Sequence, residues 1–280
     1  MSKYFKFDTK LVFLGFFVAL FSAGIGIGGG TLLVSILISL FGFDFKKAAR
    51  TSLSTIMPIS FVGAISHFIF LPETPDMSYY YIFIPSCVLG TVLGGIIVQK
   101  HPNNFLKLIF SLFLLIISLR MMKLFDFPYL MYSELGTMLF ANEYLLIVPI
   151  GICIGIIAVL LGIGCGLLIV PFYVIIIDLD IHEAITLSLT TMFFLSVSTT
   201  IINNRMKTLD ITPLKSLLLP ALVGAVFGAM ISSHLPTLLL KKLFGVILFL
   251  IASNYLIHLS DMNRRLTLLA KNITRMVKHH

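Results

Sequence analysis

The residues with the clearest chemical potential are the glycines of segment 24–30, where five of seven positions are glycine. Each glycine disfavours a helix interior by roughly 1 kcal/mol relative to alanine, so we expect this segment to interrupt a helix. A helix that restarts after such a break presents unpaired N–H groups and the positive end of its dipole, which together bind anions without lysine or arginine. A second glycine run, at 162–166, predicts a similar break. The residues expected to line an anion site at these breaks are Gly28, Gly29, Gly30, Thr31, Gly164, Cys165 and Gly166.

A cluster of hydroxyl side chains follows each glycine run. Residues 51–55 are Thr-Ser-Leu-Ser-Thr, and residues 188–191 are Ser-Leu-Thr-Thr. Hydroxyls on one face of a helix could donate hydrogen bonds to an oxyanion. Serine and threonine also pack membrane helices together, so a structural role is the alternative. The hydroxyl residues predicted to orient the substrate are Ser52, Thr55, Ser188 and Thr191.

Ionisable side chains are scarce in the apolar segments around these motifs. No aspartate or glutamate lies inside a predicted span. Cation pumps and proton relays usually need such intramembrane acids, so the sequence favours an anionic ligand. His67 is a candidate for a proton-linked role, and a structural hydrogen bond is the alternative for the same side chain.

Catalytic and cofactor chemistry finds no support in the sequence. No HExxH motif and no Ser/His or Asp/Asp set lies deep in the predicted spans, so we do not expect an enzyme. Cys87, Cys153 and Cys165 form no CxxC pair, which argues against a zinc site or a disulfide framework. A dinucleotide-binding loop needs a preceding strand in a βαβ unit, whereas this glycine run lies in an apolar membrane segment. We therefore expect neither a metal nor a cofactor.

Membrane helices are the elements that must position these residues. The 280 residues are 58% hydrophobic and only 11% charged, whereas a soluble domain carries about a quarter charged residues. The basic residues lie mostly at segment ends, which indicates membrane orientation and not nucleic-acid binding. Full spans are predicted at 51–71, 79–98, 105–122, 187–204, 217–233 and 235–259, and glycine-broken segments at 11–41 and 144–177. Polar loops are predicted at 42–50 and 178–183.

An internal repeat relates the two halves of the chain. A shift of 136 residues superimposes the two glycine runs and the two hydroxyl clusters, and aligns His67 with Asn203. A shift of 134 then aligns Gly90 and Gly94 with Gly224 and Gly228. These GxxxG pairs are typical of closely packed membrane helices. An ordered series of matches with a slip of two residues indicates a duplicated unit.

The distribution of lysine and arginine predicts that the two repeats have opposite orientations. If each broken segment is a re-entrant hairpin, most basic loops fall on the cytoplasmic side, as do both termini. The predicted fold is an all-α polytopic membrane protein with two inverted repeats, each a re-entrant glycine-broken hairpin plus three transmembrane helices. The chain divides into a first repeat (1–123), an inter-repeat loop (124–143), a second repeat (144–260) and a basic tail (261–280). This tail could form an amphipathic helix on an anionic membrane surface or remain solvated.

These motifs resemble the sulfite exporter TauE/SafE family, also called the toluenesulfonate uptake permease family. The resemblance rests on Gly26–Gly30 with Leu33 and Val34, on 162–171, and on the Ala-x-x-x-Ser-Leu patches at 48–53 and 184–189. It covers the chain from about Leu11 to Leu259 and implies a bacterial inner-membrane carrier of sulfite, organosulfonates or related sulfur-containing anions, usually outward. Two departures leave the anion open: Ser35, where the second repeat has Pro171, and Cys165, where glycine is common.

We therefore expect an exporter of small sulfur-containing anions that works by alternating access around a midplane site between the two breaks. An anion channel of the same topology and a carrier of another small organic anion are the alternatives. The expected partners are the substrate anion and the lipid bilayer, and the sequence leaves a homodimer open.

Overall fold

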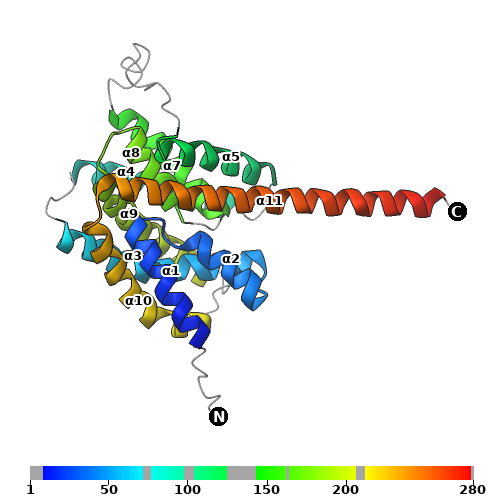
Figure 1. Ribbon diagram of the computed structural model, residues 1–280, viewed down its shortest axis with the longest axis horizontal. Coiled ribbons are helices and arrows are strands. Elements are labelled where there is room, and N and C mark those ends of the chain that lie inside the picture. Colours follow the sequence, from blue (N-terminus) through cyan, green and yellow to red (C-terminus); the bar gives the residue numbers. More distant parts are fainter. Residues whose placement is uncertain are drawn as a thin grey trace, which may run out of the picture. The chain divides into compact units, whose positions relative to one another are not determined.

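The computed structural model describes residues 9–71, 77–97, 104–124, 143–161, 164–205 and 212–278. Within these ranges the chain forms ten α-helices and no strand, which confirms the predicted all-α class (Figure 1). The helices are α1 (Thr9–Ile25), α2 (Gly30–Phe41), α3 (Phe45–Phe70), α4 (Met77–Ile97), α5 (Asn104–Met121), α7 (Glu143–Leu161), α8 (Gly166–Ile175), α9 (Ile181–Arg205), α10 (Thr212–Ser233) and α11 (Thr237–Lys278).

Two predicted loops are shorter than expected because their polar residues begin helices. Segment 42–50 was expected to be a loop, yet only Gly42 to Asp44 are non-helical, and Gly42 ends α2 in a left-handed conformation. In segment 178–183, α9 already begins at Ile181, where an Asp180 carboxylate oxygen accepts the N–H of His182 at 2.9 Å. Polar residues at a helix start satisfy amides that the helix itself leaves unpaired, so polarity alone did not mark these loops.

The last predicted span and the basic tail form one helix instead of two elements. α11 runs without interruption from Thr237 to Lys278. The sequence has no glycine or proline from Val246 to Lys278, so no residue there disfavours helix strongly enough to end it. Residues 279–280 lie outside the described part of the chain.

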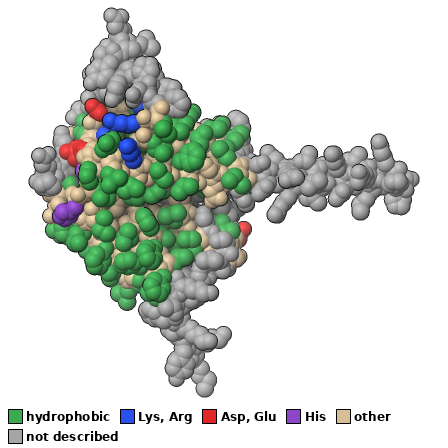
Figure 2. Space-filling view, viewed as in Figure 1, with side chains coloured by type: hydrophobic (Ala, Val, Ile, Leu, Met, Phe, Trp, Pro, Cys, Tyr) green, Lys and Arg blue, Asp and Glu red, His purple; other side chains and the backbone are tan. Residues whose placement is uncertain are grey.

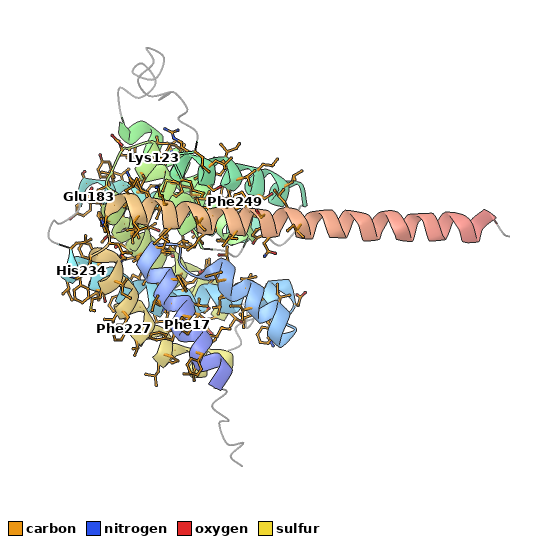
Figure 3. All side chains as sticks on the ribbon, viewed as in Figure 1. Phe17, Lys123, Glu183, Phe227, His234 and Phe249 are labelled. Carbon is orange, nitrogen blue, oxygen red and sulfur yellow. The ribbon has the colours of Figure 1, made fainter. Side chains whose placement is uncertain are left out.

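The surface composition agrees with a membrane environment. Three described stretches are long and apolar enough to cross a bilayer: Lys47–Phe70, Ile181–Ile202 and Thr237–Ile257. Figure 2 shows hydrophobic side chains over most of the described surface on one face. Phe17 of α1 and Phe227 of α10, labelled in Figure 3, are 52% and 46% exposed, which is costly in water and favourable in lipid.

The chain folds into two compact units. One unit contains α1–α4, α7–α10 and the first turn of α11, and the other contains α5 and α11 from Lys242 onward. In the second unit α5 and α11 run antiparallel, because Phe110 lies against Tyr255 with ring centroids 6.3 Å apart while Met122 lies against Gly245.

Close glycine contacts join helices of different repeats in the first unit. On α10, a Cβ added to Gly224 or Gly228 would overlap the carbonyl oxygen of Phe16 or Leu20 on α1. The repeat-equivalent glycines of α4 lie against α7 in the same way. A Cβ added to Gly90 would overlap the Ile152 carbonyl, and a Cβ added to Gly94 would lie 3.0 Å from the Ile156 Cα. In both pairs the contacts advance along the two helices together, so α1 runs parallel to α10 and α4 runs parallel to α7. The predicted packing role of the GxxxG pairs is confirmed.

The repeat-equivalent helices α3 and α9 pack directly against each other. The Thr200 hydroxyl lies 3.4 Å from that of Ser54, and the rings of Phe193 and Phe61 are 4.9 Å apart. Further along, Leu189 lies 3.4 Å from the position of a Cβ on Gly63. Residue numbers rise along α3 as they fall along α9, so the two helices are antiparallel.

Candidate functional site

The first glycine run interrupts a helix as predicted. α1 ends at Ile25 and α2 begins at Gly30. Between them Gly26, Gly28 and Gly29 have φ values of 74°, 83° and 61°. This left-handed region costs other L-residues of order 1 kcal/mol or more, which explains why glycine recurs here.

The second break lies in direct contact with the first. Gly164 has a φ of 74°, Cys165 is the residue before α8, and α8 begins at Gly166. A Cβ on Gly166 would overlap the carbonyl oxygen of Gly26 and the backbone carbonyl of Ile27. Residues 162–163 of the predicted run lie outside the described residues. The structure therefore brings the two breaks together backbone to backbone.

The start of α2 carries a run of backbone amides that have no acceptor among the described residues. The N–H of Leu33 donates to the Gly29 carbonyl at 2.8 Å, whereas the N–H groups from Gly28 to Leu32 donate no hydrogen bond to a described residue. Gly28 to Thr31 are buried. Buried amides without partners cost free energy, so they favour an incoming acceptor.

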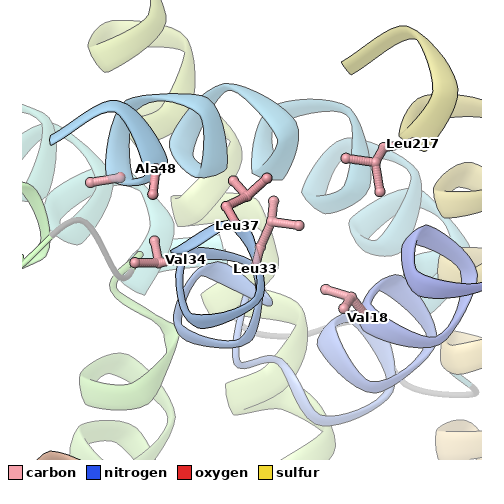
Figure 4. Packing of buried hydrophobic residues seen from close by; sticks show 7 residues of the cluster. Val18, Leu33, Val34, Leu37, Ala48 and Leu217 are labelled. Carbon is pink, nitrogen blue, oxygen red and sulfur yellow. The ribbon is translucent and has the colours of Figure 1, made fainter. Parts of the chain in front are cut away.

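Apolar packing fixes α2 at this site. Leu33, Val34 and Leu37 of α2 share a buried cluster with Val18 of α1 (Figure 4). The rest of that cluster comes from α3 and α10, through Ala48, Ala49 and Leu217. α2 is therefore held by three other helices, which keeps its amide end in a fixed orientation.

The four predicted hydroxyl residues all donate to backbone carbonyls. The Ser52 hydroxyl donates to Gly30 at 3.1 Å and the Ser188 hydroxyl to Gly26 at 2.8 Å, so both secure the first break. The hydroxyls of Thr55 and Thr191 donate within their own helices, to Thr51 and Leu187, at 2.8 Å each. A hydroxyl has one hydrogen to donate, so in this conformation these side chains offer an anion no free O–H.

Two other hydroxyls at the first break are not engaged within the described part of the chain. The Ser22 and Thr31 hydroxyls are buried and have no hydrogen-bond partner there. Ser22 Oγ lies 3.2 Å from the position of a Cβ on Gly29, the residue that precedes α2. Sequence reasoning missed Ser22, although its place one turn before the break was a usable signal. The equivalent residues of the second repeat are Ala158 and Leu167, so only the first break carries these hydroxyls.

The site is electrically neutral apart from the backbone. In the described residues, the buried side chains that carry a polar group include serines, threonines, tyrosines and His67, without any buried lysine, arginine, aspartate or glutamate. Amide dipoles at the start of α2 therefore dominate the local field, and their sign favours an anion. No described group of histidine, cysteine or acidic side chains has the arrangement of a metal site.

His67 caps the end of α1. Its Nε2 atom lies 2.9 Å from the carbonyl oxygen of Ala23. A carbonyl only accepts, so Nε2 carries the hydrogen, and Nδ1 has no partner among the described residues. Ala23 contributes one of the last carbonyls of α1, which the break deprives of a helical donor. This geometry supports the structural reading of His67, and the proton-linked role remains a prediction.

Removing the His67 cap should destabilise the first break. We expect His67→Leu to lower the free energy of unfolding by about 1–3 kcal/mol, because the Ala23 carbonyl stays buried without a donor. His67→Gln retains an N–H donor and should recover much of this loss. Thermal unfolding of both variants in detergent measures the difference. If His67→Gln instead shifts the pH dependence of transport while the melting temperature stays unchanged, the proton-linked role is the correct one.

A family model and a curated relative both match this chain. A sequence model of the family described as "Sulfite exporter TauE/SafE" matches residues 3–121 and 147–276. The chain is similar to the "Probable membrane transporter protein YunE" of Bacillus subtilis (strain 168), with 33% identity over 102 residues. That alignment spans 36% of this chain and 37% of the relative. The search of solved structures found no match.

Proposed function

Since the chain belongs to the sulfite exporter TauE/SafE family of membrane transporters, we propose that it exports a small sulfur-containing anion such as sulfite or an organosulfonate. The alignment with the curated relative spans little more than a third of either protein. The proposed substrate and the proposed direction of transport are therefore based on the family and on the site. We further propose the bacterial inner membrane as its location, with both termini cytoplasmic.

The buried amide run at the start of α2 is the observation that carries the anion proposal. The N–H groups from Gly28 to Leu32 and the hydroxyls of Ser22 and Thr31, which have no hydrogen-bond partner within the described residues, offer donors and no negative charge. An oxyanion would satisfy these donors, whereas a cation would meet the positive end of the helix dipole. The predicted residues of the second break would close the site from the other side through Gly164, Cys165 and Gly166.

We propose that the two repeats are inverted in the membrane and that transport proceeds by alternating access. Antiparallel packing of the equivalent helices α3 and α9 supports this arrangement, because repeats of the same orientation would give parallel spans. The parallel pairs α1 with α10 and α4 with α7 fit the same inverted scheme. Rocking of the repeats around the joined breaks would then expose the site to one side at a time.

Labelling of single cysteines tests the inverted topology. We expect Lys46→Cys, at the start of α3, to react with membrane-impermeant thiol reagents from the cytoplasmic side. We expect His182→Cys, at the start of α9, to react from the opposite side. The native cysteines would be replaced by alanine in both proteins. Reaction of both positions from the same side would contradict the proposal.

Reconstituted flux tests the function itself. Purified protein in liposomes would be assayed with sulfite, sulfate, thiosulfate, taurine and sulfoacetate. A carrier of sulfur-containing anions gives saturable, steeply temperature-dependent flux of at least one of them. Flux without saturation would indicate an anion channel of the same fold, and transport of none of the five would overturn the proposed substrate class.

A further inference from the structure

The side chain of Met192 lies between Gly28 of the first break and Gly164 of the second, beside the point where the two backbones meet. Met192 lies on α9, one turn after Ser188, and is only 1% exposed. A Cβ added to Gly28 would overlap the Met192 sulfur. The same sulfur lies 3.8 Å from the position of a Cβ on Gly164. Gly28 is the first residue of the run of amides that have no acceptor among the described residues, so the thioether lies beside the start of that run.

Ile56 is the repeat equivalent of Met192 and faces the opposite break. It lies on α3, one turn after Ser52, and its Cδ1 atom is 3.3 Å from the position of a Cβ on Gly164. It is also 1% exposed. Each repeat thus supplies one apolar side chain to the break of the other repeat.

The two side chains differ in how easily they move. Methionine is unbranched and has three rotatable bonds, so it adapts to new surroundings at little cost. Isoleucine is branched at Cβ, and in a helix it is confined almost entirely to one χ1 rotamer. The pair therefore combines a movable side chain over Gly28 with a rigid one against Gly164.

We propose that Met192 is the gating side chain of the anion site and that Ile56 is its fixed opposing wall. This inference rests on the proposed function. An anion that approaches the amides beside Gly28 must displace the thioether, and the thioether returns when the anion leaves. A methionine that merely fills space would behave differently, because packed cores tolerate volume-conserving apolar exchanges.

Rigidity and size can be separated by substitution at position 192. Met192→Ile keeps the apolar volume but removes the flexibility, and we expect the maximal flux to fall about tenfold while the KM changes little. Met192→Leu, branched only at Cγ, should stay near the wild-type rate. Met192→Ala removes the thioether side chain that lies beside Gly28, and this variant should add a flux component that does not saturate. The control is Met230→Ile, the same exchange at an outward-facing position that is 41% exposed.

These variants would be measured in proteoliposomes with the anion of the five-member panel that the wild type carries. Thermal unfolding of each variant reports whether it folds. If Met192→Ala does not fold, the comparison of flux between Met192→Ile and Met192→Leu decides the outcome. Equal rates for the isoleucine and leucine variants would overturn the gate while leaving the transport proposal intact. A wild type that carries none of the five anions would overturn the transport proposal and the gate together.

Discussion

Replacing Gly166 with alanine is expected to lower the transport rate strongly. A Cβ at this position would overlap the carbonyl oxygen of Gly26 and the carbonyl of Ile27, which are backbone atoms and cannot rotate away. Overpacking of a tight core costs about 1–3 kcal/mol, and more where the neighbours cannot adjust. The two breaks would have to separate, so we expect flux to fall by more than about tenfold. Flux in proteoliposomes and thermal unfolding in detergent measure the two effects.

Gly95→Ala is the matched control for this substitution. It exchanges the same residue types in a helix where the nearest atom, Ile202 Cδ1, is 3.9 Å from the added Cβ. Alanine favours a helix by about 1 kcal/mol over glycine, so this variant should melt no lower than the wild type. Wild-type flux in the Gly166→Ala protein would mean that the contact between the breaks is dispensable.

Removing the Ser22 hydroxyl is expected to weaken anion binding about tenfold or more. Ser22 has no hydrogen-bond partner within the described residues and lies beside Gly29 at the start of α2. A hydrogen bond to a charged group contributes roughly 1.5–3 kcal/mol, which corresponds to a rise in KM of about tenfold or more in Ser22→Ala. The flux at saturating substrate should change less.

Two further variants make the Ser22 result specific. Ser22→Thr keeps a hydroxyl and should retain most of the affinity. Ser111→Ala removes another buried hydroxyl, one that donates to the carbonyl of Leu108 at 2.8 Å, far from the breaks in sequence. An unchanged KM in Ser22→Ala, or an equal rise in Ser111→Ala, would contradict a binding role for Ser22.

The features that could be predicted from sequence are those with local causes. Hydrophobic composition specifies membrane helices, and glycine runs interrupt them whatever their neighbours are. The helical class, the break at 26–29 and the family were therefore accessible from the residues alone. Helix starts at Phe45 and Ile181 were missed because polar residues occur both in loops and in the first turns of helices.

The features that could not be predicted depend on contacts between residues that are far apart in sequence. The hydroxyls of Ser52 and Ser188 were expected to face the substrate, but each donates to the first break, and Ser188 reaches across the repeats to do so. Met192 gave no sequence signal, since a methionine in an apolar helix usually contributes to packing. The roles of Ser188 and Met192 depend on the packing of α9 against the first break, and no local sequence pattern reveals that packing.

The pairing of α1 with α10 has a consequence for how the protein is made. Gly24 packs against Gly228, a contact that joins residues about 200 positions apart in sequence. Such a contact forms only after the intervening chain exists. An N-terminal fragment that stops before residue 124 would lack α10, which packs on α1, and α9, which packs on α3. We therefore expect the first broken segment to reach its native form only after the ribosome has finished α10, and two separately synthesised halves to depend on each other for assembly.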